Sequence, residues 1–354
     1  MKTIVFTLSI ILCALWNYAN AQTTDVINTG LNGPIYLAIN GNDLYMSEFT
    51  GDKISKIDIT AAIPTITDVI TGLNGPQGLL LNGNDLYIAE SEGGKISKID
   101  ITTGTPSTTD VISGLGYPVG MALNGNDLYI AELNTDRISK INITSVTPIR
   151  IDVVIGLNDP TGVLLNGNDL YIVEQTGGRV SKIDITDTLP ATTTTVTSGL
   201  SGSYDLTLNG NNLYISEYIG NKISKIDITA TIPTTTILVE NDVTGPAGTL
   251  VVGDGELYIT ELNANKITKI TLPTLGEEER EFAHEISIYP NPSGTSIFVK
   301  GIKKKSNYEL FNALGLKVHH GTVFENGEIS VKNLSSGKYY IRIQNREVVK
   351  FIKK

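Results

Sequence analysis

The sequence predicts an all-β protein in which a six-bladed β-propeller is followed by a small C-terminal β-sandwich. The first observation is a repeated phrase, close to Asn-Gly-Asn-Asp-Leu-Tyr-Ile-Ala-Glu, that occurs six times with 42 to 44 residues between its tyrosines. A period near 40 residues built of short strands is typical of propeller blades. The second observation is a change of charge, since residues 286–354 carry twelve Lys or Arg against four Glu, and residues 22–285 carry fourteen against thirty-three acids.

Three side chains of the phrase recur in step in all six repeats. The tyrosines are Tyr45, Tyr87, Tyr129, Tyr171, Tyr214 and Tyr258. The glutamates are Glu48, Glu90, Glu132, Glu174, Glu217 and Glu261. The lysines are Lys56, Lys98, Lys140, Lys182, Lys225 and Lys269. We expect the tyrosines to pack blades together.

Each repeat contains four runs that are typical of strands. In the second repeat they are an apolar run at 78–81, alternating runs at 85–90 and 95–101, and a β-branched run at 110–115. Asn-Gly, Gly-Gly and Pro separate them, as tight hairpins require. Both faces of a blade pack on neighbouring blades, so apolar residues occupy both parities of a strand.

The two ends of the repeat array complement each other. Residues 25–31 resemble the fourth strand of a blade, whereas the last repeat supplies only three strands, at 249–252, 256–261 and 266–272. We therefore expect the N-terminal strand to complete the last blade and close the ring. Closure removes two free sheet edges, which would otherwise favour aggregation.

Residues 1–21 have the pattern of a secretory signal peptide: Lys2, an apolar run from Ile4 to Trp16, and a small-residue cleavage site at 19–21. The propeller is expected at 22–275, and an acidic linker at 276–285 follows it. We expect no transmembrane segment in the mature chain. Its acidic propeller argues against nucleic acid as a partner.

Residues 286–354 resemble the type A sorting domain of the type IX secretion route of Gram-negative Bacteroidetes. The motif residues are Tyr289, Pro290, Asn291, Pro292, Gly315, Gly337, Tyr339, Lys353 and Lys354. The resemblance implies that these residues engage the type IX machinery and that the protein passes through the periplasm to the outer cell surface or the medium. A generic immunoglobulin-like binding module is the alternative.

The blades are similar to NHL repeats and to streptogramin (virginiamycin B) lyase repeats, for example at Gly75-Pro76-Gln77-Gly78-Leu79. Those lyases use a catalytic histidine and a divalent ion, but the histidines here, His284, His319 and His320, lie outside the blades. Gluconolactonase-like propellers bind a metal through Asn or Asp between Pro and Gly of inner strands. The matching positions here are Ile35, Gln77, Val119, Thr161, Tyr204 and Ala247. No catalytic residue is assigned, and enzymatic activity is left open.

The glutamate ring has two interpretations. In the structural interpretation each carboxylate accepts hydrogen bonds from turn amides of its own blade or pairs with a lysine of the next strand. In the other interpretation the carboxylates bind a hard cation such as calcium, which takes six to eight oxygens. The uniform spacing favours the structural interpretation. We therefore expect no cofactor and no metal ligands, with a divalent cation as the alternative.

Sites that break the repeat are the better candidates for ligand binding. Ser203-Tyr204-Asp205 replaces Pro-x-Gly in the fifth repeat, where Tyr218 also begins a turn, and Tyr36 replaces the glycine in the first. Tyrosine combines apolar area with a polar tip, which suits a sugar or a peptide. The sequence thus favours a secreted, non-catalytic propeller that binds an extracellular protein or glycan. The alternative is a divergent metal-dependent lyase or lactonase.

Overall fold

The computed structural model describes residues 21–230, 233–253, 255–272, 287–300, 305–312, 317–343 and 347–354. The chain forms two compact units, which divide after Leu272. Most of the predicted signal peptide and the whole predicted linker lie outside the described residues. So does Gly315 of the sorting motif.

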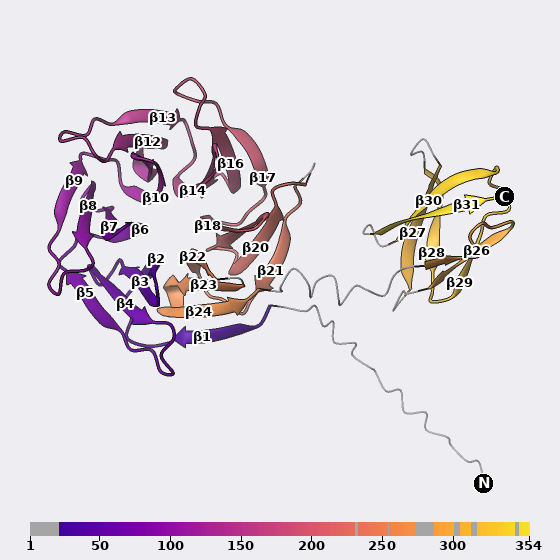
Figure 1. Cartoon of the computed structure of the whole chain (residues 1–354), viewed down its shortest axis with the longest axis horizontal. Coiled ribbons are helices and arrows are strands. Elements are labelled where there is room, and N and C mark those ends of the chain that lie inside the picture. Colours follow the sequence, from indigo (N-terminus) through magenta and orange to yellow (C-terminus); the bar gives the residue numbers. More distant parts are fainter. Residues whose placement is uncertain are drawn as a thin grey trace, which may run out of the picture. The chain divides into compact units, whose positions relative to one another are not determined.

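The first unit is a propeller of six four-stranded antiparallel sheets arranged around a central axis (Figure 1). The innermost strands, which lie nearest the axis in Figure 1, are β2 (Pro34–Asn40), β6 (Pro76–Asn82), β10 (Pro118–Asn124), β14 (Pro160–Asn166), β18 (Ser203–Asn209) and β22 (Pro246–Val252). The second strands are β3 (Asp43–Glu48), β7 (Asp85–Glu90), β11 (Asp127–Glu132), β15 (Asp169–Glu174), β19 (Asn212–Glu217) and β23 (Glu256–Glu261). The third strands are β4 (Lys53–Asp58), β8 (Lys95–Asp100), β12 (Arg137–Asn142), β16 (Arg179–Asp184), β20 (Lys222–Asp227) and β24 (Lys266–Thr271). The outer strands are β5 (Thr67–Thr71), β9 (Thr109–Ser113), β13 (Ile151–Ile155), β17 (Thr194–Ser198), β21 (Thr236–Glu240) and β1 (Thr23–Ile27). Short 3-10 turns, η1 (Leu133–Thr135) and η2 (Leu262–Ala264), follow β11 and β23.

The predicted ring closure is confirmed, because β1 pairs with β24 and completes the sixth sheet. Lys266 Nζ lies 3.0 Å from Asp25 Oδ1 across this pair. Blade six is also joined to blade one, since the Thr260 hydroxyl donates to the Ile35 carbonyl oxygen at 2.6 Å. Two segments more than two hundred residues apart in sequence thus hold the ring together.

The predicted strands are present with small differences in their bounds. The second strands agree with the prediction, whereas the inner strands begin earlier, at the proline of the Pro-x-Gly segment. A register irregularity sits at that segment in every inner strand, for example between Pro76 and Leu79. The irregularity breaks the apolar alternation there, which is why the sequence pattern starts late.

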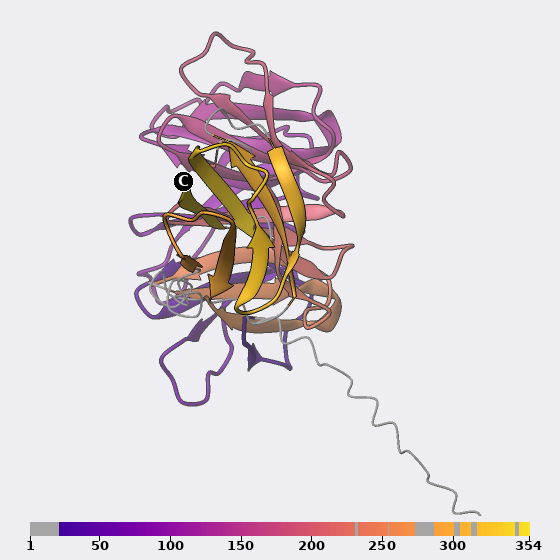
Figure 2. The same cartoon turned by 90° about the vertical axis from the view of Figure 1, so that its right-hand side faces the viewer.

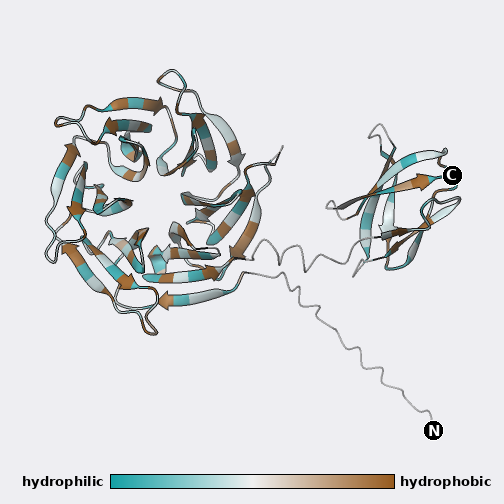
Figure 3. Cartoon of the chain, in the orientation of Figure 1, coloured by the Kyte–Doolittle hydropathy of each residue, from teal (hydrophilic) through white to brown (hydrophobic). Residues whose placement is uncertain are grey.

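Hydrophobic packing between blades forms the core. In Figure 3 hydrophobic and hydrophilic residues alternate along many strands of both units. Tyr45 and its five equivalents are buried, at 2 to 4 % exposure, as expected for residues that pack blades together. In blades one to four the lysine of the third strand also lies over this ring, for example Lys56 Nζ at 5.7 Å from the Tyr45 centroid.

The second unit is a β-sandwich of a three-stranded and a four-stranded sheet, drawn in gold and yellow in Figure 2. The smaller sheet has the order β25 (Ser287–Tyr289), β26 (Ser296–Lys300), β29 (Gly327–Ser330). The larger has the order β28 (Lys317–Val323), β27 (Ser306–Asn312), β30 (Gly337–Ile343), β31 (Glu347–Lys353). Side chains of both sheets, including Val299, Leu310 and Phe351, form one buried core.

Candidate functional site at the propeller axis

The glutamate ring is saturated by donors from the protein itself. In each blade the glutamate is at most 3 % exposed and accepts a hydrogen bond from a Ser or Thr hydroxyl of the third strand. Its other oxygen accepts from a backbone N–H in the loop before the inner strand. In each blade a Lys or Arg side-chain nitrogen also lies 2.6 to 3.4 Å from an oxygen of the glutamate. These contacts are the ones that the structural interpretation predicts.

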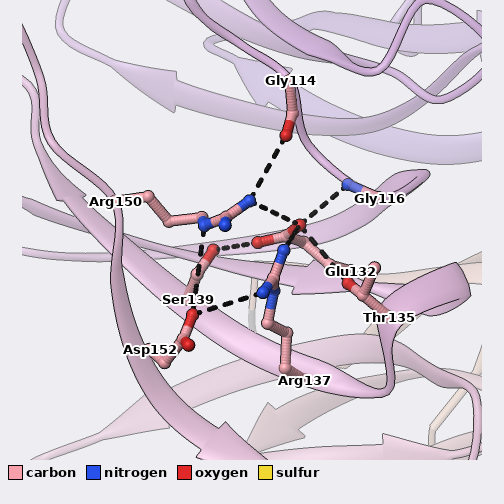
Figure 4. Close-up of polar contacts among 8 residues, drawn as sticks. All are labelled: Gly114, Gly116, Glu132, Thr135, Arg137, Ser139, Arg150 and Asp152. Carbon is pink, nitrogen blue, oxygen red and sulfur yellow. Dashed lines mark hydrogen bonds and ion pairs between the residues drawn. The ribbon is translucent and has the colours of Figure 1, made fainter.

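Glu132 carries the most extensive set of contacts (Figure 4). Its oxygens accept from Ser139 at 2.5 Å, from the Gly116 N–H at 2.8 Å and from Arg137 at 2.9 Å. Arg150 approaches the same carboxylate at 3.6 Å. Burial alone would raise the pKa of Glu132, but the hydrogen bonds from Arg137, Gly116 and Ser139 hold it below its ordinary value. The carboxylate is therefore ionised and fully engaged within its blade.

Among the described residues no group of three or more His, Cys, Asp or Glu side chains lies close enough together to hold a metal ion. The two best-defined grooves in the part of the chain that the structure describes lie away from the axis. They measure about 510 and 320 Å³ and both are lined by residues of the loop before β13.

The Pro-x-Gly segments bring adjacent blades into close contact. A Cβ atom on Gly78 would lie 1.9 Å from the carbonyl oxygen of Val119, and one on Gly248 would lie 2.1 Å from that of Ile35. Only glycine fits such an approach. Tyr36 and Asp205 occupy this same position in blades one and five, so these two blades must depart from the common packing. The departures are the ones that the sequence singled out.

The structure brings three of the four predicted ligand-binding residues together as an aromatic cluster. The Tyr36 and Tyr204 ring centroids lie 6.1 Å apart, and those of Tyr204 and Tyr218 lie 6.4 Å apart, with interplanar angles of 52° and 51°. Tyr36 is buried, and its hydroxyl has no hydrogen-bond partner. Tyr204 and Tyr218 are half-buried, and the Tyr218 hydroxyl donates to Asn263 Oδ1 at 2.9 Å.

Asp205, the next residue after Tyr204, is buried. Its Oδ2 accepts hydrogen bonds from the backbone N–H of Thr249 at 2.8 Å and from the Thr249 hydroxyl at 3.3 Å. Burial raises the pKa of Asp205 to about 7, although the bonds from Thr249 oppose the shift. Asp205 therefore links blade five to blade six and does not reach the surface as the sequence suggested.

Two residues that the sequence analysis did not select as ligand contacts complete the cluster. The Tyr204 hydroxyl donates to Gln77 Oε1 at 2.5 Å. Burial raises the pKa of the Tyr117 hydroxyl, and the charge of Glu92 adds to this, whereas a hydrogen bond with Gln77 opposes it. Tyr117 has φ +59°, the left-handed region that a bulky residue rarely adopts. The signal for Tyr117 was present in the sequence, since the equivalent residue is Gly in four blades.

Half-buried apolar residues surround these tyrosines at the same end of the blades. Phe49, Tyr117, Leu133, Tyr204 and Leu262 all pack against one core cluster that includes the inner-strand residues Ile35, Val119 and Ala247. Because these residues come from blades one, three, five and six, the cluster spans the axis. We call the half-buried set Phe49, Tyr117, Leu133, Tyr204, Tyr218 and Leu262 the axial face.

In the C-terminal unit the predicted sorting motif holds the last strand in place. The Asn291 side chain donates to the Lys350 carbonyl at 3.2 Å and accepts from the Ile352 N–H at 2.9 Å. Ser293 bonds to Ile352 and Lys354 through its backbone, and the peptide bonds before Pro290 and Pro292 are cis. Tyr339 stacks on Phe351 with centroids 5.7 Å apart, and its hydroxyl donates to the Ser335 carbonyl. Tyr289 is 41 % exposed, whereas the Lys353 side chain lies largely buried.

Solved structures similar to the chain share the propeller fold. A streptogramin B lyase is 16 % identical, with a TM-score of 0.56 over 72 % of this chain and 99 % of that one. A chain of a nidogen/laminin complex is 14 % identical, with a TM-score of 0.55 over 63 % and 87 %. A PQQ-bound aldose sugar dehydrogenase from Streptomyces coelicolor is 14 % identical, with a TM-score of 0.54 over 72 % and 98 %. No curated protein sequence matches significantly.

Within the described residues no helix is long and apolar enough to cross a membrane. The C-terminal unit matches a family model over residues 287–354, that of the secretion system C-terminal sorting domain. This match agrees with the resemblance seen in the motif residues. The protein thus carries a six-bladed propeller and a tail that indicates export by type IX secretion to the cell surface or the extracellular space, as is typical of Bacteroidetes.

Proposed function

We propose that the exported propeller is a non-catalytic binding module that recognises an extracellular protein or glycan through the axial face. The observation that carries the proposal is the joining of Tyr36, Tyr204 and Tyr218 into one cluster although they lie in blades one and five. Half-buried tyrosines that combine an apolar body with a polar tip are frequent in binding surfaces.

The chemistry of the blades supports binding over catalysis. The pKa of Asp205 lies near neutrality, but this residue is 6 % exposed and bonded to Thr249. The ring glutamates are occupied by donors of their own blades. The similar folds include a lyase, a dehydrogenase and a member of a protein complex, so fold alone does not decide between the classes.

The experiment compares the full mature chain with its Tyr218→Ser variant on a glycan array and in capture of surface proteins from the producing cells. Tyr218 is half-buried, and its hydroxyl donates a hydrogen bond to the side chain of the exposed Asn263, so the variant should fold. Ile63→Ser, on the exposed loop of blade one, serves as the matched control because Ile63 is 83 % exposed. We expect a ligand that binds the wild type and Ile63→Ser but is retained at least tenfold less by Tyr218→Ser. Equal retention by all three proteins would refute the axial face as the binding site.

A further inference from the structure

The charge and aromatic content of the axial region define the class of ligand, on the assumption that the proposed binding function holds. Five positions per blade surround the axis at this end: the residue before the Pro of Pro-x-Gly, the x and Gly positions, and the two residues after the ring glutamate. The thirty residues at these positions include five aromatics, three acids and no base. The aromatics are Tyr36, Phe49, Tyr117, Tyr204 and Tyr218. The acids are Glu92, Asp159 and Asp205.

The basic residues at this end of the blades already form ion pairs with the ring glutamates. Lys53 and its equivalents start the third strands and pair with the ring glutamates, for example Lys95 with Glu90 at 3.4 Å and Lys222 with Glu217 at 3.4 Å. Asp205 is buried with a pKa near neutrality, so Glu92 and Asp159 supply the negative charge at this end of the blades, and none of the thirty residues is a base that would offset it. A negative field over aromatic faces attracts cations and repels anions.

The geometry of the rings favours a cation over a sugar. Successive rings of Tyr36, Tyr204 and Tyr218 are tilted by 52° and 51°. A sugar face stacks best on one flat platform, whereas a compact cation can lie over the outer faces of several tilted rings, within about 6 Å of each ring centroid. Tyr36 is buried and packs against the Tyr204 ring. The half-buried rings of Tyr117, Tyr204 and Tyr218 are the faces that a ligand can reach, and we call these three rings the cage.

Tyr117 is held in a backbone conformation that has a cost. Its φ of +59° is the one that glycine adopts at the equivalent position in four other blades, for example Gly75 at +60° and Gly202 at +61°. A bulky residue in this region is strained, and such strain is concentrated at functional sites. In return the Tyr117 hydroxyl forms a hydrogen bond with Gln77, and it lies close enough to Glu92 for that charge to raise its pKa further after burial has raised it.

The side chains of the axial face are half-buried, and the two best-defined grooves among the described residues lie elsewhere, beside the loop before β13. A shallow face of this kind can contact one side chain that protrudes from a larger partner. Lysine and arginine present a cation on a long apolar stem, which Leu133, Leu262 and Phe49 can contact.

We propose that the axial face binds the cationic side chain of a lysine or arginine presented by an extracellular polypeptide, with Tyr117 as a strained contact residue of the cage. The partner is then a basic segment, attracted over a distance by the acidic propeller, which carries twenty-eight acids against thirteen bases in residues 22–275. Glu92 and the rings of Tyr117, Tyr204 and Tyr218 receive the cation.

The experiment titrates the full mature chain, labelled with ¹³C in its tyrosine rings, with the amide of N-acetyl-Gly-Lys-Gly and its arginine analogue. The norleucine analogue keeps the stem and lacks the charge, and an N-acetylglucosamine trimer tests the sugar class. We expect saturable shifts with the two cationic peptides only, weakened as salt rises from about 0.05 to 0.5 M because the attraction is screened. Shifts with norleucine or the sugar equal to those with lysine would overturn the proposal.

Two variants distinguish the contribution of the Tyr117 ring to binding from the effect of relieving backbone strain. Tyr117→Gly restores the residue of the repeat, so it should fold with an equal or higher melting temperature and bind the lysine peptide at least tenfold more weakly. Asn241→Gly also relieves a left-handed residue, at φ +66° and at an exposed position, but removes neither a ring nor a charge, and should bind as the wild type does. Unchanged binding by Tyr117→Gly would remove Tyr117 from the site. Loss of glycan or protein capture in Tyr218→Ser without any response to the cationic peptides would overturn this inference and leave the proposed function standing.

Discussion

The Tyr204 hydroxyl of blade five hydrogen-bonds the Gln77 side chain of blade two at 2.5 Å, a contact between opposite blades of the six-membered ring. The bond crosses the axis and fixes the Tyr204 ring between Tyr36 and Tyr218. A ring fixed in this way loses little conformational entropy when a ligand binds, which favours affinity. The segment Ser203-Tyr204-Asp205, which replaces Pro-x-Gly, also supplies Asp205. Titration of this carboxyl group should make the free energy of unfolding depend on pH.

Asp205→Asn should change the pH dependence of stability. Its pKa of about 7 lies above the ordinary value of 3.8, so the folded state binds the proton more tightly than the unfolded state. This group therefore lowers the free energy of unfolding as pH rises from about 4 to 7, by about 4 kcal/mol in total. The amide oxygen can still accept from Thr249. Urea unfolding should show the variant more stable than wild type at pH 8 and equal to it near pH 4. Parallel curves across this range would mean that Asp205 is ionised in the fold.

Glu132→Gln should cost more stability than Glu90→Gln. A hydrogen bond to a charged group contributes about 1.5–3 kcal/mol. Glu132 neutralises Arg137 and lies near Arg150, whereas Glu90 faces Lys95 alone. Because the sites lie in different blades, the two losses should add. Chemical unfolding with calcium and with chelator should give the same values. A large calcium-dependent stabilisation erased by either change would instead assign the ring to a cation.

Deleting residues 22–31 should open the ring. The deletion removes β1, the Asp25–Lys266 ion pair and the buried side chains of Ile27 and Leu31. Loss of two buried aliphatic residues costs about 4 kcal/mol or more, and β24 becomes a free edge. Asp25→Asn alone, the control for the exposed ion pair, should change stability by less than about 1 kcal/mol. Light scattering and thermal melting test this, and a monomer with an unchanged melting temperature would contradict the shared sixth blade.

Asn291→Ala should release the C-terminal strand of the sorting domain and reduce export. The variant loses both side-chain bonds to β31, which are worth about 1 kcal/mol each. Asn307→Ala, at an exposed position of β27, is the control. In a bacterium with the type IX route, Asn291→Ala should accumulate inside the cell while the control reaches the medium or surface. Normal export of both would show that the motif is dispensable for sorting.

The sequence predicts the features that recur in every blade, but it predicts few of the contacts made by residues that depart from the repeat. The strands and the closure by β1 follow from a period that every blade obeys, and the saturation of Glu132 follows from a Ser placed seven residues later in the same hairpin. The Tyr204–Gln77 bond joins residues 127 positions apart, and no local pattern encodes it. Asp205 looked like a surface ligand because a polar residue replaced glycine, but its position between blades makes it buried. Tyr117 replaces a residue that is Gly in four blades, and only the structure shows that it keeps the left-handed φ of those glycines.

Hydrogen–deuterium exchange of the mature chain, with and without the strongest binder from the array and capture screen, tests the binding account most directly. The account predicts slower exchange in the segments that carry the axial face, which are residues 49–50, 116–118, 133–134, 203–206, 217–220 and 262–263. It predicts no change in the outer strands β5, β9 and β13. Protection confined to those outer strands or to residues 287–354, with the axial segments unchanged, would contradict it.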